Sequence, residues 1–146
     1  MKVAVSGATG LVGGALCESF RENDVEILAI TRGGRSLPSY IKPVPWSPSN
    51  GDLDADLLEG TDVVVHLAGE SIANRWTRSH KERIRSSRVE GTRHLVNGLR
   101  RLDKPPSLLI SASAVGFYGD RGDEELDESS PPGTGFLPDV CQAWES

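Results

Sequence analysis

The chain has 146 residues, of which 37% are hydrophobic and 25% charged, which is ordinary for a globular protein and enough for a domain with its own core. Its net charge of −5 argues against general nucleic-acid binding, and no apolar run approaches the roughly 20 residues of a membrane helix. Its two distant cysteines, its three scattered histidines and the absence of a signal peptide indicate a cytoplasmic protein without a metal site.

The first half of the chain alternates buried strands with a helix. Apolar runs over residues 3–6 and 25–30 predict two buried strands, and apolar residues recur with a helical period over residues 11–20 between them. The stretch of residues 31–52 is rich in Pro, Gly and Ser, so we expect mostly loop there, with a short edge strand near residues 40–46.

The second half repeats this alternation with a longer helix. Residues 54–60 are typical of a helical turn closed by glycine, and residues 62–69 of another buried strand. A long helix is predicted over residues 77–102, broken only by two glycines, and the next strand over residues 107–113.

The chain closes with an acidic loop, residues 119–135, and a helix that begins near Pro138. The loop is either disordered or an active-site loop that awaits a ligand. Alternating strands and helices predict a parallel sheet with helices on both faces, and right-handed crossovers make it an open, doubly wound sheet. We therefore expect residues 1–146 to form one α/β domain.

The strongest functional signal is the segment VSGATGLVGG, which lies between the first strand and the first helix. Gly7 permits a tight turn, Gly10 lets the backbone approach a pyrophosphate, and Gly13 lets the helix pack closely on the strand. Free N–H groups near Leu11 and Val12 then face the anion, with the helix dipole behind them. The segment predicts a Rossmann-type dinucleotide site; the alternative is that the glycines serve tight packing alone.

The end of the second strand indicates which dinucleotide binds. An NAD site usually carries Asp or Glu there to bind the ribose 2′-OH, whereas this chain has Arg32, with Arg35 close behind. Because an arginine fork suits a 2′-phosphate, we expect NADP(H) to be preferred over NAD(H). In the alternative interpretation, Arg32 is a solvated loop residue.

These motifs resemble the extended short-chain dehydrogenase/reductase superfamily, whose TGxxGxxG turn is matched here with Ser6 in place of Thr. VVVHLAGE is similar to the superfamily strand that ends against the cofactor. The segments LAGESIANRWTRSHKERIRSSRVEGT, SASAVGFYGD and CQAWE resemble an atypical branch labelled sugar-nucleotide-epimerase-like or cell-division-inhibitor-like. The combination of Glu70, Arg75, Trp76 and Arg88 is much narrower than the glycine turn, and the resemblance covers essentially the whole chain.

Relatives in this branch are typically about twice as long, and their second half supplies further strands and a small substrate-binding region. The resemblance therefore implies that this chain is the N-terminal, cofactor-binding half of a longer protein. A cloned fragment, a split gene and the remnant of a longer chain all fit this interpretation. Without a substrate region, we expect the isolated chain to be inactive.

The resemblance also implies a catalytic set of Tyr, Lys, Ser and Asn, in which the Lys lowers the Tyr pKa for proton transfer. Aligning the superfamily helix on Glu145 places Leu137 at the Tyr position and Cys141 at the Lys position. Arg88 stands at the Asn position, and only Ser113 matches. The atypical branch shows these departures in general, so they do not by themselves mean loss of function.

Tyr118 is the nearby phenol. As a candidate catalytic residue it would donate a proton with the support of Ser113; the alternative is a structural Tyr that packs its own loop.

Arg88 lies on one face of the long helix with Ile84 and Leu95, and on the superfamily pattern it would point toward the cofactor. The alternative is an exposed helix Arg. Glu70 follows a strand end, where it would accept from a ribose hydroxyl or pair with Arg88 or Arg75. Trp76 would either staple the helix or cover the site as a lid, and we favour packing. The full set of expected cofactor-binding residues is Gly7, Thr9, Gly10, Leu11, Val12, Gly13, Thr31, Arg32, Arg35, Leu67, Ala68, Gly69, Glu70 and Arg88.

Basic residues crowd residues 75–101, and the acidic segment over residues 120–128 could neutralise them. A solvated face or a homodimer contact through residues 77–102 fits this stripe better than nucleic acid. Two functions stay open: an NADP-dependent oxidoreductase or epimerase-like enzyme acting on an unknown small molecule, such as a sugar nucleotide, and a non-catalytic NADP-binding regulatory or structural protein.

Overall fold

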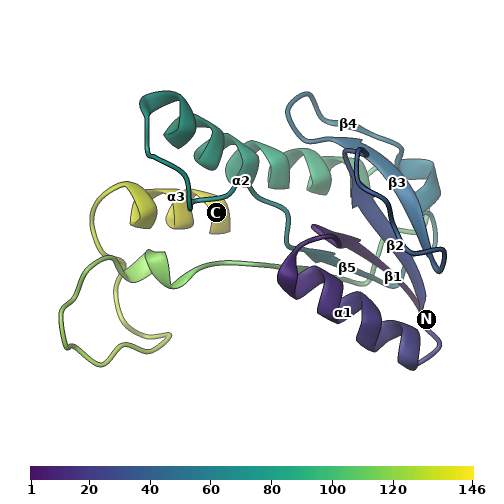
Figure 1. The fold of residues 1–146 in the computed structure, drawn as a ribbon, viewed down its shortest axis with the longest axis horizontal. Coiled ribbons are helices and arrows are strands. Elements are labelled where there is room, and N and C mark those ends of the chain that lie inside the picture. Colours follow the sequence, from purple (N-terminus) through teal and green to yellow (C-terminus); the bar gives the residue numbers. More distant parts are fainter. The chain divides into compact units, whose positions relative to one another are not determined.

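The computed structural model describes all of residues 1–146, which divide into two compact units, residues 1–112 and residues 113–146 (Figure 1). The expectation of a single domain stays a prediction. The first unit contains β1 (Lys2–Ser6), α1 (Leu11–Glu22), β2 (Glu26–Thr31), β3 (Ile41–Ser47), β4 (Asp52–Leu53), the 3-10 helix η1 (Ala55–Leu58), β5 (Val63–His66), α2 (Arg78–Leu99) and β6 (Leu108–Ser111). The second contains the 3-10 helix η2 (Val115–Tyr118) and α3 (Phe136–Glu145).

The strands of the first unit form one sheet in the order β4-β3-β2-β1-β5-β6. All neighbours pair in parallel except β3 and β4, which are antiparallel. The chain runs outward from β1 to β3 and returns to place β5 on the other side of β1, so the strand order reverses between β1 and β5. This arrangement confirms the predicted doubly wound, Rossmann-type fold. Ligands of such sheets bind beyond the carboxyl ends of the strands at this reversal point.

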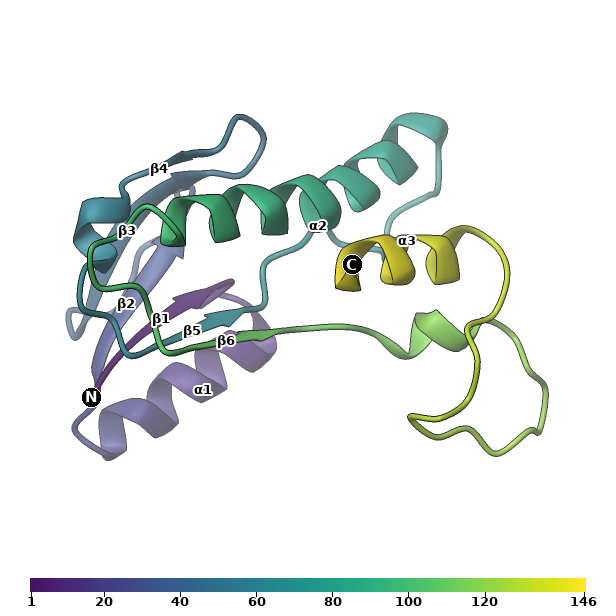
Figure 2. The same cartoon turned by 180° about the vertical axis from the view of Figure 1, so that it is seen from behind.

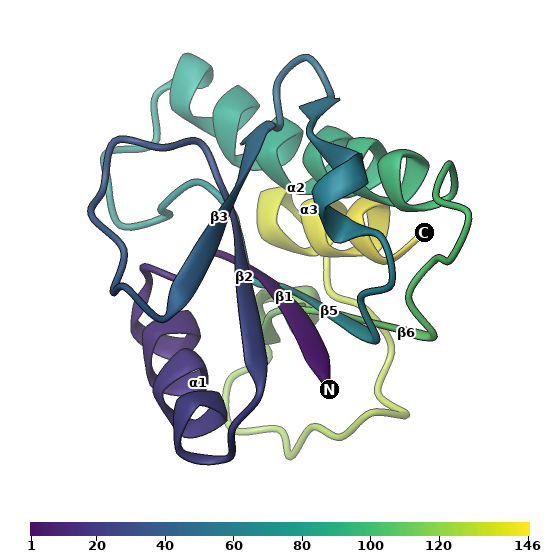
Figure 3. The same ribbon diagram turned by 90° about the vertical axis from the view of Figure 1, so that its right-hand side faces the viewer.

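Helices cover both faces of the sheet, as Figure 3 shows with α1 on one side and α2 on the other. Alternate residues of β1 point to opposite faces, so Val3 and Val5 join the core under α1 while Ala4 joins the core under α2. The first core also contains Cys17, Ile27, Ala29, Ile41 and Val65, and the second Leu28, Ile30, Val44, Trp46, Leu58, Val64, Leu95 and Leu99.

The strand β3 corrects the expectation of a short edge strand. It has seven residues and lies second from the edge, between β2 and β4. Its two prolines are tolerated because Pro45 directs its carbonyl to the N–H of Asp54, on the side away from β2. Pro43, two residues earlier, faces the same way, so neither proline removes a hydrogen bond to β2.

The helix α2 is continuous through both glycines and ends at Leu99, three residues before the predicted end. Gly91 and Gly98 are buried, and a Cβ at Gly98 would approach Leu53 Cδ2 to 2.5 Å, so this glycine permits close packing against β4. The N-terminus of α2 is capped by Thr77, whose hydroxyl accepts from the N–H of His80 (3.2 Å). None of the α-helices is both long and apolar enough to cross a membrane.

The view from behind shows β6 beyond β5 at the sheet edge opposite to β4 (Figure 2). Leu109 of β6 packs on the core under α2, whereas Leu108 and Ile110 point to the other face and are about half exposed. Alternation along this strand therefore leaves apolar surface on one side of the sheet.

The second unit is held together by contacts between α3 and the segment around η2. A Cβ at Gly116 would lie 3.3 Å from Leu137 Cβ, and Cys141 Sγ lies 3.9 Å from the carbonyl oxygen of Ala114. The loop of residues 119–135 contains turns but no helix or strand, and α3 begins at Phe136, two residues before the predicted start.

Candidate functional site

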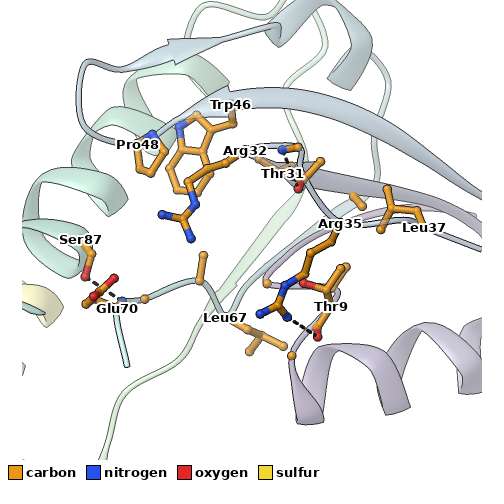
Figure 4. Close-up of a pocket in the computed structure, with 18 residues that line it drawn as sticks. Thr9, Thr31, Arg32, Arg35, Leu37, Trp46, Pro48, Leu67, Glu70 and Ser87 are labelled. Atoms are coloured by element: carbon orange, nitrogen blue, oxygen red, sulfur yellow. Dashed lines mark hydrogen bonds between the residues drawn. The ribbon is translucent and has the colours of Figure 1, made fainter. Parts of the chain in front are cut away.

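A cavity of about 310 Å³ lies in the first unit, at the carboxyl ends of β1, β2, β3 and β5 (Figure 4). This is the position expected for the ligand of a doubly wound sheet. Ser6 pairs with Ile30 on one side and His66 on the other, so these three strands reach the cavity at the same level. The predicted site residues that line it are Gly7, Thr9, Gly10, Thr31, Arg32, Arg35, Leu67, Ala68, Gly69 and Glu70.

The glycine turn leaves no room for side chains. Gly7 has φ +74°, and a Cβ there would lie 2.9 Å from the carbonyl carbon of Leu67; a Cβ at Gly13 would collide with the carbonyl oxygen of Gly7. No side chain caps α1, whose N-cap is Gly10, so its first N–H groups remain available to an anion. The residues present therefore fit a dinucleotide pyrophosphate, and Gly13 serves the helix packing that its position predicts.

Two arginines follow β2 along one side of the cavity. Arg32 is exposed and has no hydrogen bond or ion pair, and its guanidinium extends over the cavity (Figure 4). Arg35 Nη1 donates to the carbonyl oxygen of Thr9 at 3.4 Å, which connects the loop after β2 to the glycine turn. A positive charge without a partner at the end of β2 is suited to an anionic group of a ligand.

The lining of the cavity also contains residues that the sequence did not single out (Figure 4). Trp46 and Pro48, at the end of β3, line the cavity together with Leu37 and Ser87. Trp46 is 5% exposed, and its ring is wedged between the sheet and α2, where its Cη2 lies near Gly91. The one sequence feature that could have indicated these residues is an aromatic residue, Trp46, inside a proline-rich stretch.

Glu70 is held to α2 through its backbone as well as its side chain. Its N–H donates to Ser87 Oγ (3.0 Å), and its carbonyl oxygen accepts from Arg88 Nη1 (3.0 Å). The carboxylate lies 3.6 Å from Arg83 Nε; of the two predicted partners, Arg88 bonds the Glu70 carbonyl oxygen and Arg75 precedes α2. The difference follows from where α2 begins, because Arg83 lies in its first turns whereas Arg75 precedes the helix.

Arg88 lies beside the cavity rather than in its lining. Its guanidinium packs flat on Gly69, where a Cβ would lie 3.2 Å from Cζ, and Nη1 also donates to the carbonyl oxygen of Ile84 (3.2 Å). Both of these bonds from Nη1 are thus directed at backbone carbonyls. Its contact with a cofactor stays a prediction.

Further side chains fix the segment between β5 and α2. His80 is buried and bonds through Nε2 to the carbonyl oxygen of Ser71 (2.9 Å), and Trp76 Nε1 donates to the carbonyl oxygen of Ile72 (2.8 Å). Lys81 Nζ lies over the Trp76 ring, 5.7 Å from its centroid. Trp76 is nevertheless 41% exposed, so its packing role stays a prediction.

A buried polar group lies directly beneath the glycine turn. His66 is fully buried, with Nδ1 2.6 Å from Ser6 Oγ and Nε2 3.0 Å from Thr92 Oγ1, and its ring meets Trp46 edge to face. Burial lowers the pKa of His66 from 6.5 to about 4, so the imidazole is neutral at pH 7.

The remaining predicted residues lie elsewhere. The side chains of Leu11 and Val12 are exposed on α1 and do not line the cavity. Ser113 and Tyr118 belong to the second unit: Ser113 Oγ donates to the Glu145 carboxylate, and Tyr118 OH donates to the carbonyl oxygen of Asp127 (2.9 Å). The catalytic roles of Ser113 and Tyr118 stay predictions.

Comparison with known proteins identifies relatives over nearly the whole chain. Residues 3–136 match the model of the NAD dependent epimerase/dehydratase family. The epimerase family protein MT2273 of Mycobacterium tuberculosis is 38% identical over 145 residues, which cover 99% of this chain and 46% of the relative. The chain spans about half the length of the curated relatives it matches.

Solved structures agree with this assignment. The nucleoside-diphosphate sugar epimerase from Corynebacterium glutamicum is 41% identical with a TM-score of 0.79, and the match covers 99% of this chain and 29% of that one. Human epimerase family protein SDR39U1 (isoform 2), solved with NADPH, is 27% identical with a TM-score of 0.79, covering 99% and 48%. These matches confirm the resemblance that the motifs indicated.

Proposed function

Because the chain belongs to the NAD-dependent epimerase/dehydratase family, we propose that it is the cofactor-binding half of an NADP-dependent oxidoreductase or epimerase-like protein of the extended short-chain dehydrogenase/reductase type. One observation carries the choice of NADP: Arg32, at the end of β2, extends over the cavity without a partner where an NAD site has a carboxylate. The NADPH bound to human SDR39U1 supports the same choice.

Different residues of the cavity bind different parts of the cofactor. The turn from Gly7 to Gly10 and the N-terminus of α1 hold the pyrophosphate through backbone N–H groups. Arg32 and Arg35 bind the 2′-phosphate, because two guanidinium groups neutralise a dianion that Asp or Glu would repel. A bound nicotinamide supplies or accepts a hydride.

The complete protein acts on a small molecule in this proposal, and a sugar nucleotide is the first candidate. The Corynebacterium relative, a nucleoside-diphosphate sugar epimerase, supports a sugar nucleotide as the substrate. Ser113 and Tyr118 then provide the hydrogen bond and the proton. The wild-type complete protein would turn over substrate, and Tyr118→Phe would abolish that turnover.

A second function, a non-catalytic NADP-binding regulatory or structural protein, is favoured by contacts in the second unit. Leu137 and Cys141, which replace the catalytic Tyr and Lys, face the segment that follows Ser113. The hydroxyl of Tyr118 is already bonded to its own loop. Tight NADPH binding by the complete protein, with no turnover of sugar nucleotides, ketones or aldehydes, would establish this alternative. A homodimer through α2 is a further part of the proposal, tested by light scattering.

Calorimetry on the 146-residue chain tests the cofactor assignment. We expect low-micromolar or tighter NADPH binding by the wild type and at least about tenfold weaker NADH binding, since a charge-assisted bond to a phosphate contributes about 1.5–3 kcal/mol. Arg32→Ala should remove the preference. Arg101→Ala is the matched control, because Arg101 is exposed and does not line the cavity. Equal affinities for both cofactors in the wild type would refute the arginine clamp, and binding of neither would refute the proposed function.

A further inference from the structure

Three elements of the first unit meet through one buried chain of hydrogen bonds. Ser6, the last residue of β1, lies between His66, the last residue of β5, and the backbone that follows it. Ser6 Oγ accepts from the N–H groups of Leu67 (3.1 Å) and Ala68 (3.2 Å), and the Leu67 N–H is shared with the Ser6 carbonyl. Both Ser6 and His66 are 0% exposed, so water does not compete for these bonds.

The position of each proton follows from a count of donors and acceptors. Two backbone N–H groups occupy the lone pairs of Ser6 Oγ, so its own proton is donated to His66 Nδ1. Nδ1 must therefore be unprotonated, and the neutral ring carries its proton on Nε2, which donates to Thr92 Oγ1. Only this tautomer gives every group in this chain of hydrogen bonds a partner.

The hydrogen bonds of Ser6 and His66 lie where two walls of the cavity meet. Gly7 follows Ser6 directly and begins the glycine turn, while Leu67 and Ala68 form the facing wall. The two backbones are in contact, because a Cβ at Gly7 would lie 2.9–3.1 Å from atoms of Leu67 and Ala68. Neither Ser6 nor His66 lines the cavity, so any effect they have on a ligand is transmitted through these backbones.

We propose that His66 is a positioning residue for the cofactor: by accepting the Ser6 proton, it leaves Ser6 Oγ free to hold the end of β5 against the glycine turn. The inference rests on the proposed NADP site. It predicts that loss of the acceptor at Nδ1 displaces the wall that faces the pyrophosphate, while the 2′-phosphate contacts of Arg32 are unaffected.

Two substitutions of His66 separate positioning from packing. In His66→Asn, Oδ1 takes the place of Nδ1 and still accepts from Ser6, but the outer part of the ring is lost and a void remains. In His66→Leu, the volume is better filled but no acceptor is present. A role in packing alone predicts that the Leu variant binds cofactor at least as well as the Asn variant, whereas positioning predicts the reverse order.

Calorimetry with two ligands provides the test. NADPH spans the glycine turn, and adenosine 2′-monophosphate carries the 2′-phosphate without the pyrophosphate. We expect His66→Leu and Ser6→Ala to weaken NADPH binding about tenfold, the effect of one unsatisfied buried hydrogen bond, and His66→Asn to stay within about twofold of the wild type. Binding of adenosine 2′-monophosphate should change less than about twofold in all three.

Thr61→Val is the matched control, because Thr61 is a buried hydroxyl without a partner that does not line the cavity. It should leave NADPH binding unchanged. If the wild type does not bind NADPH, both the proposed function and this inference are refuted. If the wild type binds and both His66→Leu and Ser6→Ala bind equally well, the positioning role alone is refuted.

Nitrogen NMR of the wild-type chain supplies a readout independent of the variants. At pH 7 the His66 signals should show Nε2 protonated and Nδ1 unprotonated. A proton on Nδ1 would contradict the donor count and overturn the proposal even if every variant failed to fold.

Discussion

Acidification should destabilise the first unit through His66 before it protonates most carboxylates. The pKa of His66 is lowered from 6.5 to about 4 by burial. Between these values the unfolded chain binds a proton that the folded chain does not, so the free energy of unfolding falls as the pH decreases. The loss begins near pH 6.5 and is complete below about pH 4.

The size of the effect follows from the two pKa values. Linkage gives a loss of about 2 kcal/mol between pH 7 and pH 5 and about 3 kcal/mol by pH 4. In His66→Asn this titration is absent, so the variant should lose less stability over the same range although it is less stable at pH 7. His80 and His94 are present in both proteins and cancel in the difference.

Urea unfolding followed by far-UV circular dichroism at pH 7, 6 and 5 measures both proteins. Stability between pH 7 and 5 should fall about 2 kcal/mol more in the wild type than in His66→Asn. Parallel pH dependences would mean that His66 is not held neutral by burial. An increase of wild-type stability on acidification would refute the sign of the reasoning.

Two glycine substitutions should separate the site from the scaffold. Gly13→Ala places a Cβ against the carbonyl oxygen of Gly7, so we expect a loss of about 1–3 kcal/mol in urea unfolding together with weaker NADPH binding; unchanged affinity would show that the glycine turn tolerates displacement. Gly98→Ala places a Cβ 2.5 Å from Leu53 Cδ2, a side-chain methyl that can move, at a position inside α2, so stability should fall less than in Gly13→Ala while the calorimetric NADPH affinity stays within about twofold. A large loss of affinity in this variant would contradict the separation.

The sequence predicts the inner part of the fold well because local and global signals coincide there. Apolar runs, a helical period and positioned glycines all define β1, α1 and β2, and the register then brings Gly7 and Arg32 to one cavity. Trp46 was missed as a lining residue because it lies in a proline-rich stretch, and the sequence does not show that both prolines of β3 face away from β2. The ion pair of Glu70 with Arg83 was missed because it depends on where α2 begins and on which of its basic side chains faces the end of β5.

The second unit shows a different limit. The alignment placed Leu137 at the Tyr position and Cys141 at the Lys position of α3, and the structure packs both against the segment that follows Ser113. Their neighbours follow from helix periodicity, which the sequence contains. The partner of Tyr118 lies in a loop without periodicity, and no local pattern indicates that the carbonyl oxygen of Asp127 accepts its hydroxyl.

The prolines of β3 make the two edges of the sheet unequal as templates for another strand. Pro43 and Pro45 lack N–H donors on the side of β3 that faces away from β2, and the two-residue β4 covers only the end of that side. A strand that paired there would lose two ladder bonds, which protects this edge against aggregation. At β6 no proline interrupts the strand, and Leu108 and Ile110 offer apolar contact. The edge at β6 is therefore the better template for a further strand.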